Sequence, residues 1–192
     1  MARLSLFGLV LLCSMATDAA AQGFFINPFV GTTLTSPTAV GSSTKPGFGV
    51  ALGGFSKVVG AETEVAYYPQ LLDNGANRLT QNRVVTFSGN TLIGPTIGPV
   101  KPYGAIGIGG LYLNVKSLSS VVVPNPESIS NTYVTINAGG GVAAWFSPHF
   151  GVRGDLRYYR AFGFKMSDVQ TAGLVLDHFD LWRAAFGVVA TF

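Results

Sequence analysis

The chain has 192 residues, of which 48% are hydrophobic and 11% are charged, and its formal net charge is +3. A soluble domain usually carries about 25% charged residues, so this composition favours a membrane protein. No run of about 18 uninterrupted apolar residues occurs, which argues against a helical membrane span, and the charges are too scattered for a nucleic-acid partner.

Residues 1–21 are typical of a secretory signal peptide. A positive start precedes an apolar run over 4–12, and small residues end at Ala21. Cys13, the one cysteine of the chain, falls inside this segment, and the residue before it is too large for a lipid-attachment site. We therefore expect cleavage after Ala21 and a single domain over 22–192 without thiol chemistry.

Eight later segments alternate apolar with small or polar residues, which is the period of a β-strand. In chain order they span 24–33, 47–57, 61–69, 81–94, 103–115, 132–146, 150–160 and 179–192. The connections between them are alternately long and short, as in outer-membrane barrels with strands of about 9–11 residues. The sequence therefore predicts an all-β fold, an eight-stranded antiparallel up-and-down transmembrane β-barrel, with both termini on the periplasmic, short-turn side.

A barrel strand points its side chains alternately to lipid and to the lumen, so charges at mid-bilayer depth should share the lumen phase. Strands four apart in a ring of eight face one another, which predicts ion pairs of Glu62 and Glu64 with Arg153 and Arg157. We favour a lumen filled by these side chains; a gate or a narrow ion path is the alternative. The predicted lumen charges are Lys57, Glu62, Glu64, Arg153, Asp155, Arg157 and Arg183, beside polar Asn90, Asn137 and Tyr159.

Residues 153–155 also form Arg-Gly-Asp, a tripeptide that some extracellular proteins display for cell attachment. The alternation places this tripeptide inside the strand 150–160, with Asp155 facing the lumen. We therefore expect a strand with inward charges and no displayed attachment motif.

Three strand charges break the lumen phase, namely Arg83, Arg160 and Asp180. Each lies at the end of its strand, beside a long connection, where the barrel wall meets the outer headgroups. A charge costs about 0–1 kcal/mol there, against about 2–4 kcal/mol for a cation at the midplane. Lipopolysaccharide phosphates are candidate partners for Arg83 and Arg160, and simple snorkelling of the side chains is the alternative.

The chain resembles the small outer-membrane β-barrel proteins, a group that contains the OmpA membrane domain, OmpW and the opacity-type porin family. The resemblance covers essentially the whole mature chain, in PYGAIGIG (102–109), GNTLIGP (89–95), INAGGGVAAWF (136–146), GVRGDLRYY (151–159) and WRAAFGVVATF (182–192). It implies a multi-pass protein of the outer membrane in a Gram-negative-type envelope. It also implies that Phe192 is a signal for the barrel-assembly machinery.

The resemblance favours a non-enzymatic envelope protein, structural or interacting at the cell surface, with a narrow passive channel as the alternative. Barrel enzymes that modify lipid A use a His-x-Ser pair, whereas Ser147-Pro148-His149 has the reverse order and falls in a predicted turn. A secreted lipocalin-type barrel is disfavoured by the low charge and by the terminal phenylalanine. We expect no cofactor, metal or nucleic-acid partner, and favour a monomer.

Overall fold

The computed structural model describes residues 23–34, 44–69, 81–116, 128–162 and 179–192. Eight strands are formed, and their ends differ by a few residues at most from the predicted ones. They are β1 (Phe24–Thr33), β2 (Pro46–Phe55), β3 (Val59–Pro69), β4 (Gln81–Ile93), β5 (Val100–Lys116), β6 (Ser128–Trp145), β7 (Phe150–Phe162) and β8 (Phe179–Thr191). The predicted signal segment lies outside the described residues, so its cleavage stays a prediction.

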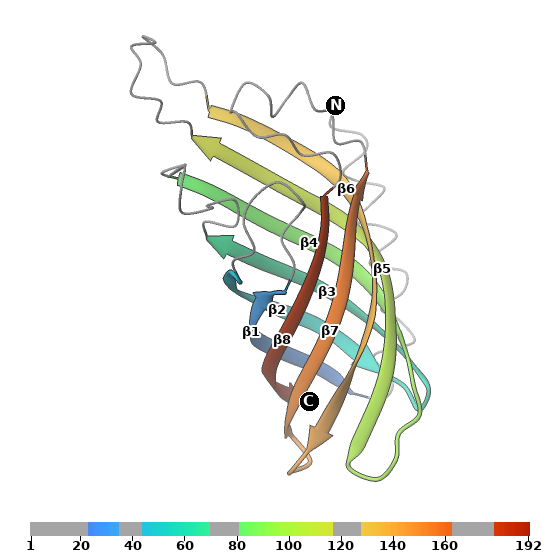
Figure 1. The fold of residues 1–192 in the computed structure, drawn as a ribbon. Coiled ribbons are helices and arrows are strands. Elements are labelled where there is room, and N and C mark those ends of the chain that lie inside the picture. Colours follow the sequence, from blue (N-terminus) through green and yellow to red (C-terminus); the bar gives the residue numbers. More distant parts are fainter. Residues whose placement is uncertain (1–22, 35–43, 70–80, 117–127, 163–178) are drawn as a thin grey trace, which may run out of the picture.

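The strands form one closed barrel in which each strand pairs antiparallel with the next and β1 pairs with β8 (Figure 1). The predicted up-and-down topology is thereby confirmed. The connections 56–58, 94–99 and 146–149 lie at one end, here called the short-turn rim, and the C-terminus lies at the same end. The opposite end is called the long-connection rim. No helix of the described residues is long and apolar enough to cross a membrane.

The barrel wall differs in height around its circumference (Figure 1). The β1–β2 ladder ends at the pair Thr32–Pro46, whereas the β5–β6 ladder continues to the pair Lys116–Ser128. Accordingly β1 and β2 have 10 residues each, and β5 and β6 have 17 and 18. The long-connection rim is therefore low beside β1 and β2 and high beside β5 and β6.

The outer face of the wall is apolar along every strand. Side chains that are large, hydrophobic and exposed include Phe48, Val65, Phe87, Ile106, Ile108, Val134, Leu156, Phe186 and Val188. Hydrocarbon is the solvent that such a surface requires, because a closed barrel satisfies its backbone hydrogen bonds internally and can present apolar side chains to lipid. A lipocalin-type barrel would instead carry its charges outside.

The lumen holds two apolar clusters with charged side chains between them. Nearer the long-connection rim is an upper cluster that includes Phe29, Tyr68, Val84, Leu111, Tyr133, Tyr159 and Leu181. Nearer the short-turn rim is a lower cluster of Phe25, Leu92, Tyr103, Ala105 and Val189, against which Phe55 and Trp145 pack. The residues along β8 show these layers, because Leu181 of the upper cluster is followed by the charged Arg183 and then by Val189 of the lower cluster. An eight-stranded barrel is narrow enough for its side chains to fill it.

Candidate functional site

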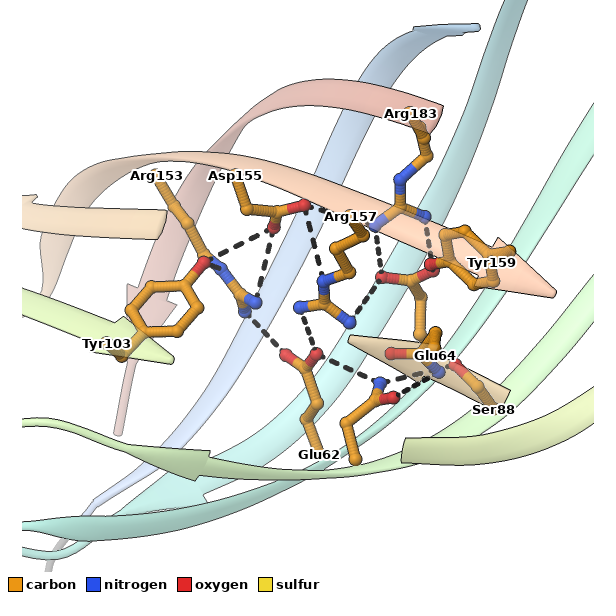
Figure 2. Close-up of polar contacts among 11 residues, drawn as sticks. Glu62, Glu64, Ser88, Tyr103, Arg153, Asp155, Arg157, Tyr159 and Arg183 are labelled. Carbon is orange, nitrogen blue, oxygen red and sulfur yellow. Dashed lines mark hydrogen bonds and ion pairs between the residues drawn. The ribbon is translucent and has the colours of Figure 1, made fainter. Parts of the chain in front are cut away.

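Glu62 on β3 binds two arginines of β7 across the lumen (Figure 2). Its Oε2 accepts a hydrogen bond from Arg153 Nη1 at 2.6 Å, and its Oε1 accepts one from Arg157 Nη2 at 2.5 Å. The amide of Asn90 also donates to Oε1, at 3.1 Å, and the amide of Asn137 donates in turn to Asn90 Oδ1 at 2.8 Å. The Glu62 carboxylate therefore joins β3, β4 and β7, and the contact between Asn137 and Asn90 adds β6.

Glu64, two residues further along β3, is held by the next set of donors (Figure 2). Arg183 of β8 grips it with both terminal nitrogens, of which Nη2 lies 2.9 Å from Oε2. Tyr159 donates its hydroxyl to Oε1 at 3.1 Å, and Arg157 Nη1 lies 3.4 Å from Oε2. A forked guanidinium that meets both oxygens of a carboxylate is the strongest of the common charge-assisted arrangements.

Asp155 supplies the third carboxylate and lies among all three arginines (Figure 2). Its oxygens lie 3.1 Å from Arg183 Nη2, 3.3 Å from Arg153 Nη2 and 3.4 Å from Arg157 Nε. Tyr103 also donates its hydroxyl to Asp155, at 3.3 Å. Asp155 therefore lies inside the barrel, with its side chain 5% exposed, and the Arg-Gly-Asp tripeptide is not displayed.

Three guanidinium groups and three carboxylates make the cluster formally neutral. Its members are Glu62, Glu64, Arg153, Asp155, Arg157 and Arg183, here called the lumen charge cluster; the three arginines are at most 1% exposed. Removing one partner from a buried ion pair costs about 3–5 kcal/mol, because the other charge is left uncompensated. Charge balance is therefore the condition that lets six ionised groups share this buried site.

Aromatic rings cover the cluster on both sides. The Arg153 guanidinium lies 4.8 Å from the centroid of the Tyr103 ring, and Arg153 Nε donates to the Tyr103 hydroxyl at 2.6 Å. At the other end the Arg183 guanidinium lies 4.9 Å from the centroid of Phe29 and 5.2 Å from that of Tyr159. Cation–π contacts of this kind are stronger when desolvated, so the rings contribute to holding the buried arginines.

Lys57 does not belong to the cluster, and its predicted position in the lumen is wrong. Strand β2 ends at Phe55, which leaves Lys57 exposed in the turn 56–58 at the short-turn rim. The lysine that does enter the barrel is Lys101, which is 2% exposed. Its Nζ donates to the carbonyl oxygens of Ser56 and Lys57 at 2.8 and 3.2 Å and lies 4.9 Å from the centroid of the Phe55 ring.

Sequence reasoning missed Lys101, which precedes the predicted strand 103–115, and Tyr103, which begins it. Lys101 stands between Val100 and Pro102, where no alternation had yet been established. Tyr103 is an aromatic residue in the inward phase, two residues before Ala105, and that phase could have identified it.

The charges that break the lumen phase lie at strand ends by the long-connection rim, on the outside of the barrel. Arg83 is exposed and pairs in register with Pro69. Arg160 Nε lies 3.8 Å from Asp180 Oδ1, and the two side chains are 46% and 38% exposed. Beneath them, the rings of Tyr158 and Trp182 pack with centroids 5.3 Å apart. Exposed charges above aromatic rings are the arrangement expected where a barrel wall meets the membrane interface.

Phe192 lies at the opposite end of the barrel. Its amide donates to the carbonyl oxygen of Phe24 at 2.9 Å, and its side chain is 73% exposed. The last residue thereby continues the closure between β8 and β1, with its ring outside the lumen.

Ser147 and His149 occupy the turn 146–149 at the short-turn rim. The Ser147 hydroxyl oxygen accepts hydrogen bonds from the backbone N–H groups of His149 and Phe150, at 3.3 and 3.0 Å. These bonds close the turn, so the serine serves the backbone there.

Residues 5–188 match the family model described as the outer membrane protein beta-barrel domain. The chain belongs to this family. It is therefore an outer-membrane β-barrel protein, in agreement with the apolar outer face of its wall. No curated protein sequence matches it.

Solved structures share the fold at low sequence identity. Neisserial surface protein A (NspA) aligns with a TM-score of 0.63 and 15% identity, over 88% of this chain and 97% of that one. A major outer membrane protein from Thermus thermophilus aligns with a TM-score of 0.63 and 13% identity, over 90% and 100%. Ail, the attachment invasion locus protein of Yersinia pestis, aligns in its complex with the heparin analogue sucrose octasulfate. That match has a TM-score of 0.57 and 16% identity, over 89% and 99%.

Proposed function

We propose that this protein is a monomeric, non-conducting barrel with a structural or surface-interaction role in the outer membrane. The observation that carries the proposal is the neutral lumen charge cluster, packed between two apolar clusters. The alternative is a narrow passive channel, in which ions or small solutes pass along the lumen. The two differ in whether the cluster opens under an applied voltage.

Conduction would require the cross-lumen contacts to separate. Glu62 binds two arginines of β7, and Glu64 binds one arginine of β7 and one of β8, so an ion path through this level must detach a carboxylate from its guanidinium partners. Breaking a buried ion pair costs about 3–5 kcal/mol, which is a factor of more than about 100 in population. The closed arrangement therefore dominates.

Single-channel recording in planar lipid bilayers tests this proposal. The purified wild-type barrel should show no discrete conductance steps. The paired variant Arg157→Ala and Arg183→Ala should show steps, because it removes two of the groups that close the lumen, whereas Lys57→Ala at the rim should stay silent. Steps in the wild type that vanish when Arg157 and Arg183 are neutralised would establish the channel instead.

The orientation of the barrel forms part of the proposal. Short turns on the periplasmic side and long connections outside are the usual arrangement of bacterial outer-membrane barrels, and this places both termini in the periplasm. External protease on intact cells should then cut within 34–46 or 161–178 and spare the turns 56–58 and 146–149. Cleavage confined to the turns would reverse the orientation.

Two contacts of the barrel complete the proposal. Arg83 and Arg160, exposed at the long-connection rim, would bind phosphate groups of lipopolysaccharide. Phe192 would be read by the barrel-assembly machinery during insertion, after removal of the signal segment 1–21. Deletion of Phe192 should lower the amount of assembled barrel, seen as heat-modifiable migration on gels, without changing synthesis.

We also propose that the protein is not an enzyme. Each carboxylate of the lumen charge cluster is bound by arginines, which leaves none of the three as a general base. Mass spectrometry of lipid A from cells with and without the protein should give identical spectra. A new or missing acyl chain would contradict this.

A further inference from the structure

The outer face of the barrel has a hollow near the long-connection rim, on the side where the wall is low. Its volume is about 690 Å³, and residues of β8, β1, β2 and β3 line it. Phe186 and Phe48 line the hollow on either side of Val30, which pairs in register with both. All three side chains are more than half exposed, so the hollow opens on the lipid side of the wall.

Small and flat side chains form the end of the hollow nearest the rim. Thr32 pairs with Ala184 on one side and with Pro46 on the other, and Pro69 of β3 also lines the hollow. Elsewhere on the outer face, phenylalanine, isoleucine and valine project from the wall. Here a row of short side chains leaves a shallow depression between two phenylalanines, open along its lipid side.

A cation lies directly beside the hollow. Arg83 pairs in register with Pro69, so its side chain leaves the same face of the wall one strand away from a lining residue. Cβ atoms of such a pair are about 4.5–5.5 Å apart. Arg83 is exposed, and among the described residues it forms no ion pair. An exposed arginine without an ion pair to any described residue therefore borders an apolar depression, at the depth where headgroups meet acyl chains.

We propose that this hollow binds one phosphorylated, acylated lipid of the outer leaflet, with an acyl chain against Val30 and a phosphate on Arg83. The proposal rests on the outward orientation of the long-connection rim given above. An apolar hollow on the lipid face is reached by acyl chains, and the guanidinium fork matches phosphate oxygens in two parallel hydrogen bonds. A free phosphate would leave the apolar hollow empty, and an uncharged lipid would form no ion pair with Arg83.

Native mass spectrometry of the detergent-solubilised barrel, titrated with lipid A, tests the site. Ala184→Phe fills the hollow, and Ala190→Phe places the same side chain on the same strand outside it, as the matched control. Arg83→Gln removes the cation, and Lys57→Gln removes one at the opposite rim. Circular dichroism and heat-modifiable migration verify that each variant is folded.

Lipid A should bind as one copy to the wild type. Ala184→Phe and Arg83→Gln should each lower the affinity for lipid A about tenfold, and both control variants should bind lipid A as tightly as the wild type. Dephosphorylated lipid A should bind equally to the wild type and to Arg83→Gln, because its phosphate is gone. Equal binding of lipid A to Ala184→Phe and Ala190→Phe would overturn the inference. It would also be overturned if Arg83→Gln lowered the affinity for lipid A and for dephosphorylated lipid A by the same factor.

The outcomes also separate this inference from the proposed function. If Arg83→Gln weakens lipid A binding while Ala184→Phe has no effect, the phosphate contact at the rim is supported and binding in the hollow is rejected. If protease shows that the long-connection rim faces the periplasm, the proposed orientation is wrong, and the proposed binding of an outer-leaflet lipid is wrong with it.

Discussion

Glu62→Gln perturbs the lumen charge cluster with almost no change in side-chain shape. The glutamine keeps an oxygen that can accept from one arginine, but the negative charge shared by Arg153 and Arg157 is lost. The cluster then has three guanidinium groups against two carboxylates. Because these groups are at most a few per cent exposed, water cannot compensate for the difference.

The expected cost follows from that burial. Breaking a buried ion pair lowers the free energy of unfolding by about 3–5 kcal/mol. The matched control is Asp180→Asn, which removes a carboxylate from a pair that is 46% and 38% exposed with a 3.8 Å separation. Exposed pairs contribute about 0.2–1 kcal/mol. The loss in free energy of unfolding should therefore be severalfold larger for Glu62→Gln than for Asp180→Asn.

Reversible urea unfolding in phospholipid vesicles, followed by the fluorescence of Trp145 and Trp182, measures both values. A second variant tests charge balance directly: Arg153→Met in the Glu62→Gln background returns the cluster to neutrality. The double variant should be more stable than the sum of the two single effects predicts, by about 0.5–3 kcal/mol. Equal costs for Glu62→Gln and Asp180→Asn, or additive effects in the double variant, would refute the reasoning.

Three further predictions concern the wall and its turns. Gly49→Ala should lower the free energy of unfolding by about 1–3 kcal/mol, because its Cβ would overlap the Val65 carbonyl oxygen, whereas Gly89→Ala, with open space around it, should not; the same urea titration measures both. Phe87→Arg, on the lipid face at mid-strand, should cost about 2–4 kcal/mol, and a cost near zero would place that face in water. Lys101→Met should speed amide hydrogen exchange in the turn 56–58, because the carbonyls of Ser56 and Lys57 lose their donor; unchanged exchange would contradict that role.

The alternation of side chains was enough to predict the eight strands and most of the lumen. In β7, Arg153, Asp155, Arg157 and Tyr159 stand two residues apart, so a single assignment of phase places all four inside. The same rule placed the charges that break phase at strand ends, because a barrel in lipid tolerates them nowhere else at low cost.

The errors arose where a strand ends, because alternation does not mark that point. The apolar and polar pattern of β2 runs past Phe55 into the turn, and Lys57 was therefore placed in the lumen. Phase also says nothing about which donor meets which acceptor. The position of Asp155 among three arginines depends on the tilt and register of β7 against β8, in which Asp155 pairs with Ala185.

The hollow on the outer face could not have been predicted from the sequence for the same reason. Its residues come from four strands, and the row from Ala184 through Thr32 to Pro46 exists only in the register that closes β8 onto β1. Hairpin neighbours can be aligned from turn lengths, but β1 and β8 are separated by nearly the whole chain. The pairing of β1 with β8 must therefore be known before this row of residues can be identified.

The central claim is that hydrocarbon surrounds the barrel while its interior is closed to lipid and solvent. Methyl-labelled NMR in lipid nanodiscs tests it on two neighbouring residues of β8 without any substitution, since Val188 is 48% exposed and Val189 is 0% exposed. The methyl groups of Val188 should give cross-peaks to lipid acyl chains, and those of Val189 should give cross-peaks to Phe25 and other lumen side chains. Acyl-chain contacts at Val189, or water contacts at Val188, would contradict the account.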